Sequence, residues 1–115
     1  MHGPSAIKYK INGQTLTFES GANVTFDDPI RKALAFPAAD TIVVCLEITG
    51  RDGRNVYGID LTGRRRWQIA DVGTTCYVGI APGEFKNSVL AMHFEGMVYD
   101  IDVVTGKVLK ATFCK

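Results

Sequence analysis

The sequence has neither a long apolar run nor an excess of charge of one sign. Its longest uninterrupted apolar stretch is residues 42–46, far short of the roughly 18 residues that a membrane-spanning helix needs. Thirteen basic residues stand against twelve acidic ones, so the net charge is +1. Because no overall field draws such a chain to nucleic acid or to anionic lipid, we expect a globular domain with neither of them as a partner.

Histidine and cysteine are scarce, and neither forms a metal-binding pattern. The two histidines are His2 and His93, and the three cysteines are Cys45, Cys76 and Cys114. No Cys-x-x-Cys or His-x-x-x-His spacing occurs, so we predict neither a metal nor a cofactor. The cysteines lie in or beside apolar segments, which favours three reduced thiols over one disulfide with a free thiol. Reduced thiols are typical of the cytoplasm, which is therefore the expected location.

Helical periodicity is also missing, whereas the alternation typical of β-strands runs from end to end. Residues 7–12 and 15–18 alternate between apolar and polar side chains, and the Asn-Gly pair between them predicts a hairpin turn. The one helical candidate is a single turn at residues 29–34, with Asp28 as its cap and Pro29 as its first residue. The other predicted strands are residues 24–26, 33–36, 41–48, 55–61, 65–69, 75–81, 89–94, 97–103 and 108–113.

An internal repeat is the strongest signal in the sequence. Residues 56–64 read Val-Tyr-Gly-Ile-Asp-Leu-Thr-Gly-Arg, and residues 98–107 read Val-Tyr-Asp-Ile-Asp-Val-Val-Thr-Gly-Lys. The correspondence continues more weakly upstream, where it pairs residues 41–45 with 88–92 and residues 34–37 with 80–82. A unit of about 45 residues that occurs twice predicts two four-stranded antiparallel meanders.

These residues resemble the repeat of quinoprotein-type (PQQ-like) β-propellers. In that family Val-Tyr-x-Ile-Asp is followed by Thr-Gly-Lys/Arg and, three residues later, by a tryptophan, and residues 56–67 match all of it. The second copy has Lys110 where the family has the aromatic residue that packs between blades. The resemblance implies propeller-like blades but no cofactor or catalytic residues, because the matching positions hold a hairpin rather than a ligand.

The repeat and the resemblance together predict one all-β domain over residues 1–115. It comprises an N-terminal hairpin at residues 6–19, a first unit at residues 29–70 and a second unit at residues 74–114. Propellers contain about four to eight blades, so two units must either assemble with further copies of the chain or fold their sheets against each other. We favour the second arrangement, a sandwich or partial barrel with the hairpin at one edge.

Two residue pairs could in principle carry catalysis. Cys76 and His93 could meet across a sheet as nucleophile and base, and Asp100 and Asp102 share one face of a strand. We expect instead that His93 is a half-buried strand residue, that Asp102 caps a turn as Asp60 does in the first repeat, and that Asp100 is solvated. No residue is therefore assigned to catalysis.

Arginine supplies the one local charge feature. Arg51 and Arg54 precede the strand predicted after them, and Arg64 and Arg66 follow it. The two pairs therefore lie at opposite ends of one sheet unless the long loop folds back. Arginine pairs with carboxylates through a planar, two-pronged geometry. These residues predict a site for an acidic protein surface, a phosphate or a carboxylate, and an exposed aromatic side chain expected at Phe85 is a second candidate contact. The alternative is a solvated loop whose arginines pair across strands with Asp60 or Asp102.

Three features beside this patch complete the prediction. Arg65 alternates to the face opposite its two arginine neighbours, so at least one of the three is expected to snorkel or to be ion-paired. Trp67 is predicted to lie in the core rather than to serve as a stacking platform. The insertion at residues 48–55 is the loop in which a partner contact is expected first.

The predicted function is non-enzymatic recognition of another protein by loops on a rigid β-sheet scaffold. Small bacterial toxin-neutralising immunity proteins look like this chain in size and composition. One alternative is a small-ligand-binding or propeller-forming subunit that self-association completes. Another is a hydrolase that uses the Cys76–His93 pair.

Overall fold

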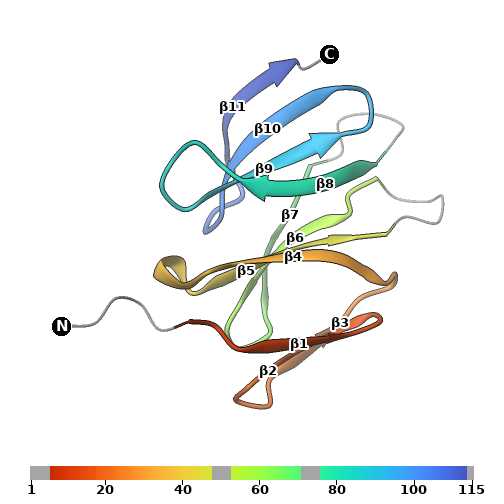
Figure 1. Ribbon diagram of the computed structural model, residues 1–115, viewed down its shortest axis with the longest axis vertical. Coiled ribbons are helices and arrows are strands. Elements are labelled where there is room, and N and C mark those ends of the chain that lie inside the picture. Colours follow the sequence, from red (N-terminus) through yellow and green to blue (C-terminus); the bar gives the residue numbers. More distant parts are fainter. Residues whose placement is uncertain (1–5, 48–52, 71–75, 114–115) are drawn as a thin grey trace.

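The structure is all-β and consists of three antiparallel sheets (Figure 1). The computed structural model describes residues 6–47, 53–70 and 76–113. The N-terminal sheet contains β1 (Tyr9–Asn12), β2 (Thr15–Phe18) and β3 (Asn23–Thr25). The first blade contains β4 (Ile30–Phe36), β5 (Thr41–Leu46), β6 (Val56–Asp60) and β7 (Arg65–Gln68). The second blade contains β8 (Tyr77–Pro82), β9 (Ser88–His93), β10 (Met97–Asp102) and β11 (Val108–Phe113).

Each sheet is a meander in which consecutive strands pair. Both predicted four-stranded units are present, and the prediction of an all-β fold with an N-terminal hairpin is confirmed. β3 extends this hairpin to a third strand that pairs with β2. In Figure 1 the three sheets follow one another along the long axis of the molecule, with the N-terminal sheet at one end and the second blade at the other.

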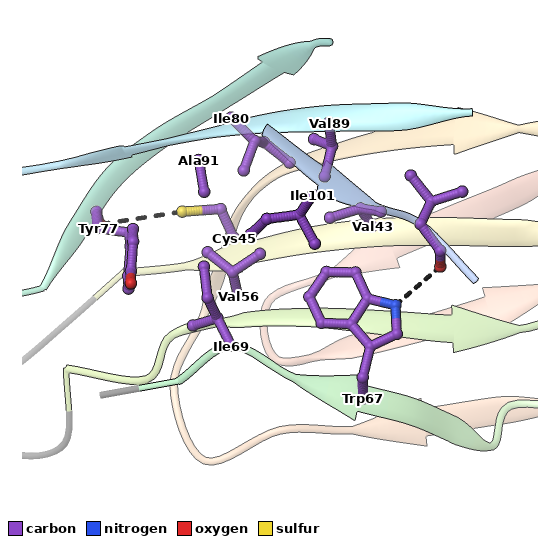
Figure 2. Close-up of a cluster of buried hydrophobic side chains, with 11 residues drawn as sticks. Val43, Cys45, Val56, Trp67, Ile69, Tyr77, Ile80, Val89, Ala91 and Ile101 are labelled. Carbon is purple, nitrogen blue, oxygen red and sulfur yellow. Dashed lines mark hydrogen bonds between the residues drawn. The ribbon is translucent and has the colours of Figure 1, made fainter. Parts of the chain in front are cut away.

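The sheets pack face to face and enclose two apolar layers. β5 supplies both layers, because all its residues are buried and successive side chains point to opposite faces. The layer between the N-terminal sheet and the first blade contains Leu16, Phe18, Phe26, Ile42, Val44, Leu46 and Ile59. The layer between the blades contains Val43, Cys45, Val56, Trp67, Ile69, Tyr77, Ile80, Val89, Ala91, Ile101 and Val103 (Figure 2). The two blades therefore close on each other, and the N-terminal sheet covers the other face of the first blade.

The turns that end β6 and β10 have the same construction. Asp60 Oδ1 accepts two backbone N–H hydrogen bonds, of 2.9 and 3.0 Å, from the turn after β6. Asp102 Oδ1 accepts two such bonds, of 2.8 and 3.1 Å, from the turn after β10. Each turn contains a glycine with positive φ, 87° at Gly63 and 78° at Gly106, where a side chain would be strained. The prediction that both aspartates cap turns is confirmed.

The helical turn predicted at residues 29–34 is wrong. Residues 30–36 form β4, which pairs along its length with β5. The short helix η1 (Pro37–Ala39) follows that strand instead. Pro29 and Asp28 satisfy the local rules for a helix start, but pairing with the fully buried β5 outweighs them. Nowhere in the described ranges is there a helix long and apolar enough to cross a membrane.

Candidate functional site

The predicted arginine patch is divided between the two ends of β6. Arg54 lies just before β6, where its Nε donates a 3.1 Å hydrogen bond to the carbonyl oxygen of Ile69. Arg64 and Arg66 lie beyond the other end of the strand, and both are exposed. Arg51 is outside the described residues. Because Arg54 is used to hold the end of a sheet, the structure leaves Arg64 and Arg66 as the grouped binding candidates.

Arg65 has a structural role. Its guanidinium carbon lies 5.1 Å from the ring centroids of both Phe26 and Tyr57. Its Nη2 also donates a 3.2 Å hydrogen bond to the carbonyl oxygen of Thr25. Cation–π attraction and this hydrogen bond tie β7 to the N-terminal sheet. Arg65 is thus committed to packing, while the arginines on either side of it remain in solvent.

The turn between Arg66 and β6 is organised around a carboxylate. Asp60 accepts a 2.6 Å hydrogen bond from the Thr62 hydroxyl, in addition to the two backbone bonds described above. Burial works to raise the pKa of Asp60, but the hydrogen bonds from Thr62 and Arg64 and the charge of Arg66 outweigh it and lower that pKa. Asp60 is therefore ionised at neutral pH, and it orders the backbone from which the two arginines project.

Packing and hydrogen bonds join Trp67, on β7, to two turns of the second blade. The Trp67 indole N–H donates a 2.7 Å hydrogen bond to the carbonyl oxygen of Val103, the bond drawn from its nitrogen in Figure 2. Gly106 lies so close to the indole that a Cβ there would be 2.7 Å from Trp67 Cγ. The Val103 N–H donates a 3.0 Å hydrogen bond to the carbonyl oxygen of Asn87, in the turn between β8 and β9. The two turns of the second blade therefore meet beside Trp67 on β7. The turn after β6 lies against the N-terminal sheet instead, where a Cβ at Gly63 would be 2.8 Å from the carbonyl oxygen of Asn23.

Phe85 is displayed on a braced turn. Its side chain is 48% exposed. Its backbone N–H donates a 3.0 Å hydrogen bond to Ser88 Oγ, which donates a 2.9 Å bond back to the Phe85 carbonyl oxygen. The N–H of Glu84 donates a 2.9 Å bond to Asp100 Oδ2. An exposed aromatic residue whose backbone is already held loses little conformational entropy on binding, which suits an anchor.

Asp100 is buried, and the prediction that it is solvated is wrong. It is 2% exposed, and its Oδ1 is the one buried side-chain oxygen without a hydrogen-bond partner in the part of the chain that the structure describes. The cause is the turn between β8 and β9, which folds over it. A Cβ at Gly83 would clash with Asp100 Oδ1 and Ser88 Oγ. Strand alternation identifies the face on which Asp100 lies, but not the loop that covers it.

We call five exposed side chains in and beside the turns of the two blades the turn surface: Arg64, Arg66, Phe85, Lys86 and Lys107. None of its four cations forms a salt bridge with another described residue. Lys107 occupies the position in the second Thr-Gly-Lys/Arg motif that Arg64 occupies in the first. The repeat therefore indicated a cation at residue 107, although the local clustering of arginines did not. No pattern in the sequence pointed to Lys86.

His93 belongs to the packing of the second blade. It is 5% exposed, which is more buried than predicted. Its ring lies edge-on to that of Tyr77 with centroids 5.0 Å apart, and its Nδ1 accepts a 3.3 Å hydrogen bond from the Glu95 N–H. Cys76 is a half-buried free thiol. Within the described ranges, no group of three or more His, Cys, Asp or Glu residues is placed to hold a metal ion.

Cys45 is expected to make the protein less stable in alkali. Burial between the blades raises the pKa of its thiol from 9.0 to about 11. Below pH 9 the thiol is neutral in both states, whereas between pH 9 and 11 it ionises only in the unfolded chain, which favours unfolding. One pKa unit corresponds to about 1.4 kcal/mol, so we expect Cys45 to account for a loss of about 2 kcal/mol between pH 8 and 10.5.

Urea unfolding of the protein and of Cys45→Ala at both pH values, in a reducing agent, measures this contribution. The alanine variant is less stable at pH 8 because it leaves a cavity, but it should lose less stability on going to pH 10.5. Parallel losses in the two proteins would show that the thiol ionises as readily in the folded state as in the unfolded chain.

Stacked four-stranded meanders, with a tryptophan on the last strand of one that packs against the next sheet, define a β-propeller-type fold. The structure is similar to the β-propeller domain of Myceliophteria thermophila Cps50 (Swd1), with a TM-score of 0.68 and 16% identity, over 94% of this chain and 39% of that one. It is also similar to BamB from Moraxella catarrhalis, with a TM-score of 0.61 and 21% identity, over 96% of this chain and 34% of that one. The predicted propeller-like repeat is thereby confirmed.

The chain corresponds to an arc of a propeller, since it spans 39% and 34% of the two propeller chains it resembles. At these identities the likeness shows the fold alone. No curated protein matches the sequence significantly. A family model described as "Domain of unknown function (DUF7957)" matches residues 6–113. The chain belongs to this family.

Proposed function

We propose that this protein is a non-enzymatic binding module that recognises an acidic protein surface through the turn surface. The observation that carries the proposal is that turns of the two blades expose four cations, none in a salt bridge with another described residue, together with one exposed aromatic side chain. Arginine forks bind carboxylates, and a central aromatic residue with a polar rim is the usual arrangement of a binding hot spot. An immunity-type role, in which the partner is a toxin neutralised in the cytoplasm, is one form of this function.

The acidic groups near the turn surface are already engaged. Asp60 and Asp102 accept hydrogen bonds from their own turns, and Glu84 pairs with Lys110 at 3.0 Å. These aspartates keep their charge, but the four cations of the turn surface outnumber them, so the local charge is positive although the whole chain carries only +1. Such a field accelerates encounter with an acidic partner and makes that rate depend on salt.

The double substitution R64E/R66E tests the proposal. We expect it to weaken binding of a fluorescently labelled peptide rich in glutamate and leucine by about tenfold or more, and Phe85→Ala to weaken it by about fivefold. Fluorescence anisotropy at low and at physiological salt measures both. The matched control is K8E/K10E on the N-terminal sheet, which makes the same charge change at two exposed lysines and should change the affinity by less than about twofold.

Two outcomes would contradict this function. An equal loss of affinity in K8E/K10E would show that net charge, and not the turn surface, drives binding. Tighter binding of a single-stranded DNA of the same charge as the peptide would identify the surface as a site for nucleic acid rather than for protein. Circular dichroism melting curves establish that each variant is folded before binding is compared.

A further inference from the structure

The second blade leaves one apolar face uncovered. Its side chains at Ile101 and Val103 lie in the layer between the blades. On the opposite side of the same sheet, Leu90, Met92 and Val98 are only half-buried. They line a shallow depression of about 320 Å³ together with Glu84, Asp100, Lys110 and Thr112. We call this side of the second blade the outer face.

The repeat identifies the outer face as the counterpart of a packed interface. The side chains that the first blade turns toward the second blade include Val43, Cys45, Val56 and Trp67. The second blade has Leu90, Met92, Val98 and Lys110 at the equivalent positions. The pairing register agrees, since Cys45 pairs with Val56 as Met92 pairs with Val98, and Gly58 pairs with Trp67 as Asp100 pairs with Lys110.

The tryptophan position and the glycine that pairs with it have changed character, since Lys110 replaces Trp67 and Asp100 replaces Gly58. In the first blade, Trp67 lies over Gly58 and beneath Gly106 of the next sheet. In the second blade, Lys110 takes that position and forms a 3.0 Å ion pair with Glu84. A further blade of the same kind would bury this ion pair and offer it no polar partner, and the desolvation is costly. A surface that brings a second, oppositely arranged pair of charges offsets part of that cost.

The opposite end of the molecule does not fit this face. Leu16 and Phe18 of the N-terminal sheet point into the core, so the alternate residues point outward. These residues are all polar: Lys10, Asn12, Thr15, Thr17, Asn23 and Thr25. The 3.0 Å contact between the hydroxyl groups of Thr15 and Thr25 confirms that they share this side. Head-to-tail assembly would therefore set polar groups against Leu90, Met92 and Val98, which does not favour a ring of copies.

We infer that the outer face binds the outer face of a second copy of this chain across a two-fold axis. The face carries an apolar centre and two opposite charges side by side, so it is complementary to itself in the way that a two-fold interface requires. Glu84 of each copy meets Lys110 of the other, while Leu90, Met92 and Val98 pack against their counterparts. The turn surface is not part of this contact.

The size of the face sets the strength of the dimer. Four strands of six residues cover roughly 20 Å by 20 Å, so two faces bury about 800 Å², less than the roughly 1,200–2,000 Å² of stable complexes. The dimer is therefore weak, with a Kd in the range of about 10–500 µM. Sedimentation equilibrium from about 10 µM to 1 mM covers this range.

Charge reversal provides the sharpest test. The single variants E84K and K110E give each face two like charges, so each variant alone should dimerise about fivefold or more weakly than the unchanged protein. An equimolar mixture of the two should recover the affinity as a heterodimer, because a face with two lysines then meets a face with two glutamates. An ion pair within one chain cannot explain this recovery, because each variant chain carries two like charges at positions 84 and 110. Met92→Glu should abolish the dimer, whereas Thr17→Glu on the N-terminal sheet should leave it unchanged.

Several results would overturn the inference. These are a monomer at every concentration, a mixture of E84K and K110E that stays monomeric, and loss of the dimer in Thr17→Glu rather than Met92→Glu. Melting curves exclude unfolding as the cause, and E84K and K110E remain informative if Met92→Glu does not fold. Because R64E/R66E leaves the outer face untouched, normal dimerisation of that variant separates this inference from the function proposed for the turn surface.

Discussion

Trp67→Ala is expected to lower the free energy of unfolding by about 3–5 kcal/mol, the range for removing a large buried aromatic side chain. Trp67 packs in the layer between the blades and is only 9% exposed. Its N–H bond to Val103 and its contacts with Gly58 and Gly106 hold the two blades together. A domain of this size is stable by about 5–15 kcal/mol, so the variant should be close to unfolding. Urea titration followed by circular dichroism measures the change.

Two further variants separate the parts of this effect. Trp67→Phe keeps much of the apolar ring but loses the hydrogen bond to Val103, and we expect it to cost about 1–3 kcal/mol because that carbonyl is left unpaired. Gly58→Ala keeps the indole but places a Cβ against it, and overpacking of this kind costs about 1–3 kcal/mol. If Trp67→Ala cost less than about 1 kcal/mol, the blades would be held by other contacts and this packing role would be wrong.

Much of the fold could be predicted because the repeat and strand alternation are local signals. The Thr-Gly turns after Asp60 and Asp102 and the core position of Trp67 follow from such patterns. β4 could not be predicted in the same way. Its residues follow an Asp-Pro sequence that suits a helix start, and only the presence of β5 beside it, which no local pattern shows, makes a strand more favourable.

The candidate site depends on contacts between distant residues, so less of it could be predicted. The sequence showed Arg54 and Arg64 as parts of one basic segment, but the structure uses Arg54 to hold the Ile69 carbonyl at the opposite end of β6. It links the turn that carries Phe85 to β7 only through the bonds from Trp67 to Val103 and from Val103 to Asn87, which join two blades. Spacing along the chain does not report such links.

Asn55 is a second link between the blades, and no sequence pattern indicated it. It is 2% exposed. Its Nδ2 donates hydrogen bonds of 2.8 Å to the carbonyl oxygens of both Leu46 and Tyr77, and its Oδ1 accepts a 3.0 Å bond from the Tyr77 N–H. One amide thus satisfies three buried backbone groups on β5 and β8. Asn55→Ala leaves the Tyr77 N–H without its Asn55 partner and leaves the two carbonyl oxygens with the weak 4.0 Å contacts from Cys45 Sγ. It should cost about 3–5 kcal/mol, since each unsatisfied group costs about 1–3 kcal/mol.

Asn55→Asp is expected to be destabilising in a pH-dependent way. An ionised carboxylate would put an acceptor against the carbonyl oxygens of Leu46 and Tyr77, so the site raises the pKa of the introduced carboxyl above its ordinary value. A raised folded-state pKa gives stability that is present below the unfolded pKa and is lost as pH rises. The penalty relative to the unchanged protein should therefore be smallest near about pH 4 and grow toward neutrality by about 1.4 kcal/mol per pH unit until the folded carboxyl ionises.

Urea unfolding of Asn55→Asp and Asn55→Ala at several pH values between about 4 and 7 tests this mechanism. Alanine has no titrating group, so its penalty should be nearly constant across the range. Asn55→Asp should be the more stable of the two in acid, where the protonated carboxyl restores one of the two lost donors, and the less stable at neutral pH. A constant difference between the variants would show that the carboxyl escapes to solvent, and that the link between β5 and β8 is not as buried as the 2% exposure of Asn55 implies.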